Sequence, residues 1–224
     1  MSTVLFVVTG ARSWTLADGS SHPTGYWAEE VLTPWRALVE AGHDVAFATP
    51  GGVVPVPDEG SLADDDDLKA VLAGLPKLSR PLRLEDIHPA HYDAIFYPGG
   101  HGPMQDLAIN PSSGALLVAA LDEEKPVGLV CHGLAALLAA KRPDGTNAAA
   151  GRTVTAFSDE EERQANLADK APWLLETTLR KQGITVDVAE AWTDHVVKDG
   201  NLVTGQNPQS SASVVQALIT RMAA

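Results

Sequence analysis

The sequence predicts an α/β protein with a mostly parallel β-sheet and helices on both of its faces. Short, β-rich apolar runs recur along the chain, and helical patterns lie between most of them, which is the rhythm of βαβ units. The runs are almost continuously apolar, as expected for strands that helices bury on both faces. They are Val4 to Val8, Val45 to Ala48, Ala94 to Tyr97, Val127 to Val130, Val154 to Ala156, Val186 to Val188 and Leu202 to Thr204.

Helices are expected between these runs. The first begins at Thr33-Pro34, because threonine can cap a helix and proline suits its first position, and Gly42 ends it. Alternatively, Glu30 to Leu32 form an earlier turn of the same helix, kinked at Pro34. The aspartates at 64–67 are interpreted as the solvated first turn of the next helix, with binding of a metal or other cation as the alternative. The remaining predicted helices are Leu68 to Leu75, Gly114 to Leu121, Gly133 to Ala140, Trp173 to Gln182 and Ser210 to Met222.

Length and composition favour one domain over residues 1–224. A chain of 224 residues with 45% hydrophobic composition can bury a sizeable single core. Residues 51–91 have weak periodicity and many prolines, so we interpret them as a small insertion over the sheet edge. Asp199-Gly200 predicts a tight hairpin.

Charge and cysteine content exclude several classes of partner. The formal net charge of −13 disfavours nucleic acid and anionic membranes, which the whole surface would repel. The first apolar run is too short to span a bilayer and lacks a basic flank, so neither a signal peptide nor a membrane anchor is expected. A single cysteine cannot form an internal disulfide or a cysteine-rich zinc site, so we expect a cytoplasmic protein.

The one cysteine stands where a parallel sheet places its active site, at the carboxyl end of a strand. Cys131 follows a predicted strand and precedes a predicted helix, a strand–turn–helix arrangement that raises a nucleophile out of the sheet. Exposed N–H groups at the helix start would draw the thiol toward thiolate. A buried cysteine can equally be a small hydrophobe. His132 and Gly133 favour the functional alternative, because they supply a candidate base and a tight backbone.

A glycine-rich segment, Pro98-Gly99-Gly100-His101-Gly102, follows another predicted strand. Its glycines allow close backbone approach and can aim N–H groups at a developing oxyanion. Nucleotide binding ranks low, because the chain has no complete dinucleotide or P-loop fingerprint and no nearby lysine. A glycine-rich turn with no catalytic role remains the alternative interpretation of this segment.

Two acidic groups are candidates for proton transfer. One member of Glu29-Glu30 is expected to face the site, where burial and a neighbouring thiolate would raise its pKa and leave it protonated. One carboxylate of the run Asp159 to Glu162 could orient His132, although spacing alone cannot choose among the four. The spacing of the remaining histidines predicts no metal site, because it contains neither H-x-x-x-H nor H-x-H, although tertiary assembly of distant residues could still build one. These histidines are His22, His43, His88, His91, His101 and His195. No cofactor is expected either.

Together these segments resemble the ThiJ/PfpI superfamily, over essentially the whole chain. The most specific pieces are residues 99–102 (GGHG), 130–133 (VCHG), 155–162 (TAFSDEEE) and 202–208 (LVTGQNP). The resemblance implies a flavodoxin-like α/β fold, related to the class I glutamine amidotransferase domain. The loop from Asp18-Gly19 through Thr24-Gly25 to Glu30 is similar to that of the glutathione-independent, glyoxalase III-like branch, some of whose members are described as stress chaperones.

The resemblance also implies roles for particular residues. Cys131 would be the nucleophile, His132 the base, Glu162 its orienting acid and Glu30 the proton carrier beside the sulfur. Backbone N–H groups of Gly100 and His132 would form the oxyanion hole, and Gly99 would belong to the same oxyanion and substrate-binding site. A homodimer is implied as well.

The function expected on this basis is conversion of methylglyoxal, or a related 2-oxoaldehyde, to the 2-hydroxy acid without glutathione or metal. The partner is then a small aldehyde, with no nucleic acid and no membrane. A cysteine-dependent peptidase or deglycase, a holdase chaperone and a redox sensor at Cys131 remain alternatives.

Overall fold

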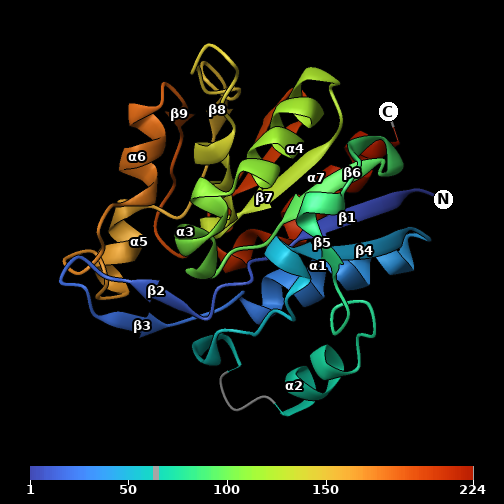
Figure 1. The fold of residues 1–224 in the computed structure, drawn as a ribbon, viewed down its shortest axis with the longest axis horizontal. Coiled ribbons are helices and arrows are strands. Elements are labelled where there is room, and N and C mark those ends of the chain that lie inside the picture. The colour runs from blue at the N-terminus through green and yellow to red at the C-terminus, as the bar shows by residue number, and fades with distance from the viewer. Residues whose placement is uncertain (63–65, 224) are drawn as a thin grey trace.

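A seven-stranded sheet forms the centre of the molecule in the computed structural model, which describes residues 1–62 and 66–223. The strand order is β10-β11-β7-β6-β1-β4-β5, and every neighbouring pair is parallel except β10 with β11. The predicted mostly parallel α/β architecture is therefore confirmed (Figure 1). The strands are β1 (Thr3–Val7), β4 (Asp44–Thr49), β5 (Leu82–Arg83), β6 (Ala94–Tyr97), β7 (Val127–Val130), β10 (Val196–Asp199) and β11 (Leu202–Gly205).

Helices cover both faces of this sheet. α1 and α7 pack against each other on one face, whereas α4 and the 3₁₀ helix η6 lie against each other on the opposite face (Figure 1). The α-helices are α1 (Ala28–Glu40), α2 (Asp66–Ala73), α3 (Gly102–Gln105), α4 (Pro111–Asp122), α5 (Asp159–Gln164), α6 (Leu175–Lys181) and α7 (Ser211–Met222). The 3₁₀ helices are η1 (Pro50–Gly52), η2 (Glu59–Ser61), η3 (Leu84–Asp86), η4 (Pro89–His91), η5 (Leu107–Ile109), η6 (Cys131–Ala139) and η7 (Pro208–Ser210).

Two predicted strands do not belong to the main sheet. β8 (Thr153–Val154) and β9 (Thr185–Val186) pair only with each other, in parallel. The predicted hairpin at Asp199-Gly200 explains this difference, because β10 folds back on β11 and occupies the free edge of that strand. Thr155 N–H reaches the Thr204 hydroxyl at 2.9 Å, so β8 is attached to the sheet through a side chain.

Three predicted helices differ from those observed. α1 already includes Glu30 and continues through Pro34, which confirms the alternative of an earlier turn; Pro34 has no N–H to donate to the Glu30 carbonyl. The segment after Cys131 is 3₁₀ rather than α-helical, and its apolar residues are buried on every side, so their pattern could not distinguish the two. α2 begins at Asp66, and the first two aspartates of the acidic run lie outside the described residues.

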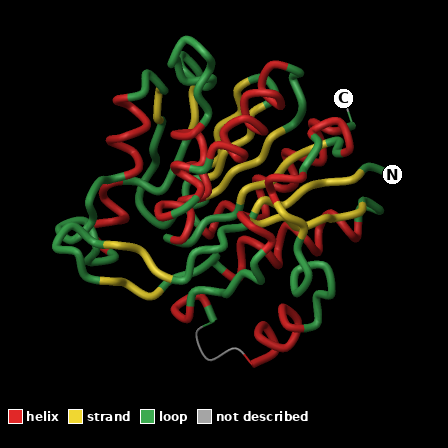
Figure 2. The backbone as a smooth tube through the Cα atoms, viewed as in Figure 1, coloured by secondary structure: helices red, strands yellow, loops and turns green. Residues whose placement is uncertain are grey.

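The segment interpreted as an insertion, residues 51–91, lies along the β4 edge and contributes one short strand, β5, to the main sheet. A second hairpin was not predicted. It consists of β2 (Ser13–Thr15) and β3 (Ser21–Pro23) and stands apart from the main sheet, between β1 and α1 in the chain (Figure 2). No helix among the described residues is both long and apolar enough to cross a bilayer.

The strand order reverses beside β1. The chain passes from β1 to β4 on one side and later returns to β6 on the other. A crevice outside the carboxyl ends of two such strands is the usual ligand site of an open α/β sheet. The segments that follow β1, β6 and β7 carry Glu30, the glycine-rich loop and Cys131, so this topology brings the predicted site residues to one place.

Candidate active site

Cys131 occupies a strained turn between β7 and η6. Its φ is +57°, a left-handed conformation that is uncommon for a residue other than glycine and costs about 1–3 kcal/mol. Gly133 makes this turn possible, because a Cβ there would lie 2.3 Å from the Tyr97 carbonyl oxygen. The thiol is held at the end of the central strands, yet the residue is only 3% exposed.

His132 links Cys131 to a carboxylate. Its Nδ1 lies 3.2 Å from the Cys131 sulfur, and its Nε2 lies 2.8 Å from Glu162 Oε2. With the Nε2 proton donated to Glu162, Nδ1 is free to accept the thiol proton. Burial, followed by the nearby His101, lowers the pKa of His132, which keeps the imidazole neutral and basic. The predicted cysteine, histidine and glutamate are thus brought together in the order that a triad requires.

Glu162 is ionised in this arrangement. Burial acts to raise its pKa, but the interactions of the carboxylate with the imidazoles of His132 and His101, each of which is hydrogen-bonded to one of its oxygens, outweigh burial and bring the pKa well below its usual range. A carboxylate that stays charged beside His132 can stabilise the imidazolium that forms when the histidine accepts a proton.

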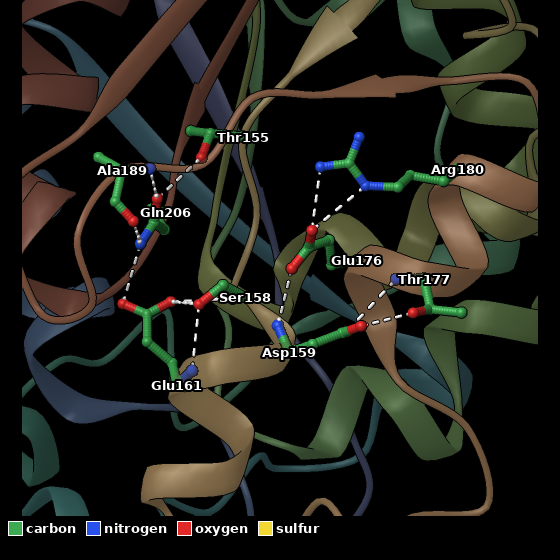
Figure 3. A network of polar contacts seen from close by, with 9 residues as sticks. All are labelled: Thr155, Ser158, Asp159, Glu161, Glu176, Thr177, Arg180, Ala189 and Gln206. Carbon is green, nitrogen blue, oxygen red and sulfur yellow. Dashed lines mark hydrogen bonds and ion pairs between the residues drawn. The ribbon is translucent and has the colours of Figure 1, made fainter.

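The other three carboxylates of the acidic run have different tasks. Asp159 accepts hydrogen bonds from the Thr177 hydroxyl and backbone N–H, and so ties the start of α5 to α6 (Figure 3). Glu160 is exposed and pairs with Arg163 within α5. Glu161 is fully buried but points away from His132, into a separate polar cluster. Glu162 is therefore the one of these four carboxylates that is hydrogen-bonded to His132, a choice that spacing alone left open.

Glu161 fixes the position of its neighbour Glu162. The Ser158 hydroxyl caps α5 by accepting the Glu161 N–H, while the Glu161 carboxylate accepts the Ser158 N–H, which is a complete capping box. The other carboxylate oxygen of Glu161 accepts hydrogen bonds from the loop after β11 and from the loop before β10. The donors to Glu161 Oε1 are Gln206 Nε2, Asn207 Nδ2 and Trp192 N–H, at 3.1, 2.8 and 2.9 Å (Figure 3 shows the Ser158 and Gln206 contacts).

Glu30 lies on the other side of Cys131 and is fully buried. Its Oε2 accepts the Gly99 N–H at 2.6 Å, and its carboxyl also interacts with the Cys131 side chain. Burial raises the pKa of Glu30 to about 8, and the hydrogen bonds from Gly99 and Cys131 only partly oppose that rise. Its neighbour Glu29 is exposed, so Glu30 is the member of the pair that faces the site. Glu30 is therefore mostly protonated at neutral pH.

Backbone N–H groups of Gly100 and His132 are both directed at the Cys131 sulfur. They are the two donors predicted for an oxyanion hole. Gly99 has a different part, because its N–H already donates to Glu30 and is not available to a substrate. A side chain at Gly99 is excluded, since a Cβ would lie 2.7 Å from His132 N and 2.9 Å from Glu30 Oε2.

The resting thiol is not activated in the way the helix start suggested. Burial and the charge of Glu30 raise the pKa of Cys131 well above its usual range, and the N–H groups of His132 and Gly100 do not compensate. The prediction of a thiol drawn toward thiolate is therefore wrong for the resting site, because desolvation outweighs the backbone donors. The same observation disfavours a redox sensor, which needs an accessible thiol of low pKa.

His101 is a site residue that the sequence did not assign a role. Its Nε2 lies 2.8 Å from Glu162 Oε1, so a single carboxylate holds two imidazoles. Trp14, from β2, stacks on the His101 ring with centroids 5.2 Å apart. His101 and His132 themselves are 4.1 Å apart, centroid to centroid. The position of His101 in the glycine-rich loop was the available clue, but its partner is 61 positions away.

Fold and site together define a class of protein: a doubly wound α/β protein with a buried cysteine on a strand–turn, backed by a histidine and a carboxylate. The sequence matches the DJ-1/PfpI family over residues 23–221, and the chain belongs to that family. The protein/nucleic acid deglycase HchA of Staphylococcus aureus is 30% identical over 98% of this chain and 79% of its own length.

Two solved structures have the same fold. One, of a protein with no functional name, is 39% identical and superposes with a TM-score of 0.88 over 99% of this chain and 98% of the other. The glyoxalase III of Candida albicans is 24% identical and superposes with a TM-score of 0.81 over 98% and 97% of the two chains. The second likeness concerns the fold alone.

Proposed function

We propose that this protein converts methylglyoxal, or a similar small 2-oxoaldehyde, to the corresponding 2-hydroxy acid with water as the only co-reactant. The observation that supports this proposal best is the buried pair of Cys131 and Glu30. A nucleophile beside a carboxyl with a pKa of about 8 combines covalent capture with a proton carrier poised near neutral pH.

The first step is addition to the aldehyde. The Cys131 sulfur attacks the aldehyde carbon while His132 Nδ1 takes the thiol proton, so the raised pKa of the resting thiol does not prevent attack. Glu162 stabilises the imidazolium. The new oxyanion is held by the N–H groups of Gly100 and His132 and then takes a proton from the Glu30 carboxyl. This leaves a hemithioacetal, the Glu30 carboxylate and a protonated His132.

The second step moves a proton between two carbons. Glu30, in its carboxylate form, removes the proton from C1, and the C2 carbonyl oxygen gains a proton from His132, which gives an enediol. Glu30 then returns its proton to C2, and the carboxylate that this leaves accepts the C1 hydroxyl proton, which produces a thioester and restores the protonated Glu30. Water, activated by His132, then releases the 2-hydroxy acid and the free thiol. One aldehyde and one water are consumed, and one acid is formed.

A deglycase is the second candidate, and the name of the Staphylococcus aureus relative favours it. Such an enzyme removes an aldehyde adduct from an amino or thiol group of a larger molecule. The 3% exposure of Cys131 favours a small free aldehyde over a glycated macromolecule, because the larger substrate would need an open site.

The test measures methylglyoxal consumption and lactate formation, with chiral analysis, in the absence of glutathione. We expect stoichiometric lactate from the wild type and near-complete loss in Cys131→Ala and Glu30→Gln. Glu29→Gln is the matched control, because Glu29 is the exposed neighbour, and it should retain activity. Preformed adducts of N-acetylarginine separate the two candidates: a deglycase consumes them faster than they dissociate spontaneously, whereas a glyoxalase is limited by that dissociation. Lactate formation that survives in Glu30→Gln would contradict the proposed mechanism.

A further inference from the structure

His101, His132 and Glu162 offer two imidazole nitrogens and a carboxylate oxygen that all lie within 4.8 Å of one another. We propose that these three side chains bind a borderline divalent cation such as Zn²⁺, and that the bound cation inhibits the cysteine site. The inhibitory part rests on the proposed function, whereas the binding part does not.

The donor set suits zinc. Two histidines and one carboxylate are a common protein ligand set for Zn²⁺, with bonds of about 2.0–2.2 Å and a fourth position left to water. Both imidazoles already face the carboxylate at 2.8 Å through their Nε2 atoms. A tetrahedral ion at this bond length needs ligand atoms roughly 3.3 Å apart. The two hydrogen bonds must therefore open by about 0.5 Å, and the two imidazole nitrogens, which lie within 4.8 Å of each other, must take the same spacing.

The surroundings hold the ligands in place and give the ion a way in. Trp14 stacks on the His101 ring, and Phe157 lies against the His132 ring with centroids 4.3 Å apart. Ring orientation is therefore fixed by packing before any ion arrives, which lowers the cost of binding. The His101 side chain is 12% exposed, compared with 3% for Glu162, so we place the entry on the His101 side.

Inhibition follows from the two nitrogens of His132. In the metal-free site the proton sits on Nε2 and Nδ1 can accept the proton of Cys131. An ion on Nε2 requires that proton to move to Nδ1, which then faces the sulfur 3.2 Å away as a donor. His132 can no longer act as the base for attack, and activity is lost without occupation of the sulfur itself.

Two other sites compete as explanations for zinc binding. Cys131 and His132 form a thiol–imidazole pair that zinc could bind directly. His88 and His91 form a surface pair with ring centroids 5.1 Å apart. Each rival predicts a different variant that abolishes binding, so the three sites can be separated by substitution.

The experiment measures Zn²⁺ binding by competition with a chromophoric chelator, on the full chain, in the Cys131→Ala background. This background has no thiol and no activity to lose, so a failure of the proposed function does not affect the result. Zinc should bind one per chain, and Co²⁺ should give visible bands of a four-coordinate ion. Because second-shell changes already weaken metal sites about 10–100-fold, His101→Asn should weaken zinc binding at least tenfold. His91→Asn is the matched control and should not change it.

In the wild-type enzyme, zinc should then inhibit methylglyoxal turnover and excess chelator should restore it. Loss of zinc binding on Cys131→Ala would overturn the proposal in favour of the thiol pair, and loss on His91→Asn would overturn it in favour of the surface pair. If His101→Asn does not fold, as judged by circular dichroism, Glu162→Gln provides the second ligand variant. Unchanged zinc affinity in the folded ligand variant would also overturn the proposal.

Discussion

Glu30→Gln should change the way in which stability depends on pH. The folded state raises the pKa of this carboxyl from 4.5 to about 8, chiefly by burial. Between these two values the native protein binds more protons than the unfolded chain, so the stability contributed by Glu30 is full below pH 4.5 and is lost as pH rises through about 8. Glutamine has nearly the same shape and does not titrate, so the variant lacks this loss.

The size of the effect follows from linkage. One extra proton bound by the native state corresponds to a slope of about 1.4 kcal/mol per pH unit. From about pH 5.5 to about pH 7.5 the unfolding free energy of Glu30→Gln should therefore rise relative to wild type by roughly 2–3 kcal/mol. The Cys131 thiol contributes little to this pH dependence, because it stays protonated over this pH range in both states. Its pKa lies well above its usual range in the folded protein and is about 8.5 in the unfolded chain.

Urea denaturation of both proteins at the two pH values measures this difference directly. Glu29→Gln serves as the control, because Glu29 is the exposed neighbour and should produce a much smaller change. An unfolding free-energy difference between wild type and Glu30→Gln that is the same at both pH values, to within about 0.5 kcal/mol, would show that Glu30 is ionised in the folded state and would refute the reasoning.

Three further predictions concern the groups around Cys131. Glu161→Ala removes the acceptor of the buried Ser158 N–H and one acceptor from each of the Gln206 and Asn207 amides, and should lower the unfolding free energy by about 3–5 kcal/mol in denaturant titrations, whereas Glu160→Ala should change it little. Gly99→Ala should abolish turnover, because the added Cβ would displace His132 N or Glu30; normal activity would show that the loop relaxes. Glu162→Gln should lower kcat of aldehyde turnover by about 10²–10⁴-fold through loss of imidazolium stabilisation, and a kcat within threefold of wild type would contradict the triad.

Much of the fold was predictable because local pattern determines it. Apolar runs located β6 and β7 to the residue, and Asp199-Gly200 located the hairpin between β10 and β11. The pattern failed where pairing is non-local: β8 and β9 look like strands of the main sheet, but an antiparallel neighbour already covers its edge. It also failed for η6, because a segment buried on all sides has no amphipathic period to read.

The sequence by itself determined which residues could carry chemistry: one cysteine at the end of a central strand, a histidine beside it, and carboxylates downstream of the strand ends. Only the tertiary structure decided what each of them does. It chose Glu162 over Glu161, gave the Gly99 N–H to Glu30, and placed His101 on the second oxygen of Glu162. It also reversed the expected effect on the thiol, because desolvation and the approach of a carboxyl from 101 positions earlier depend on packing, which no local pattern contains.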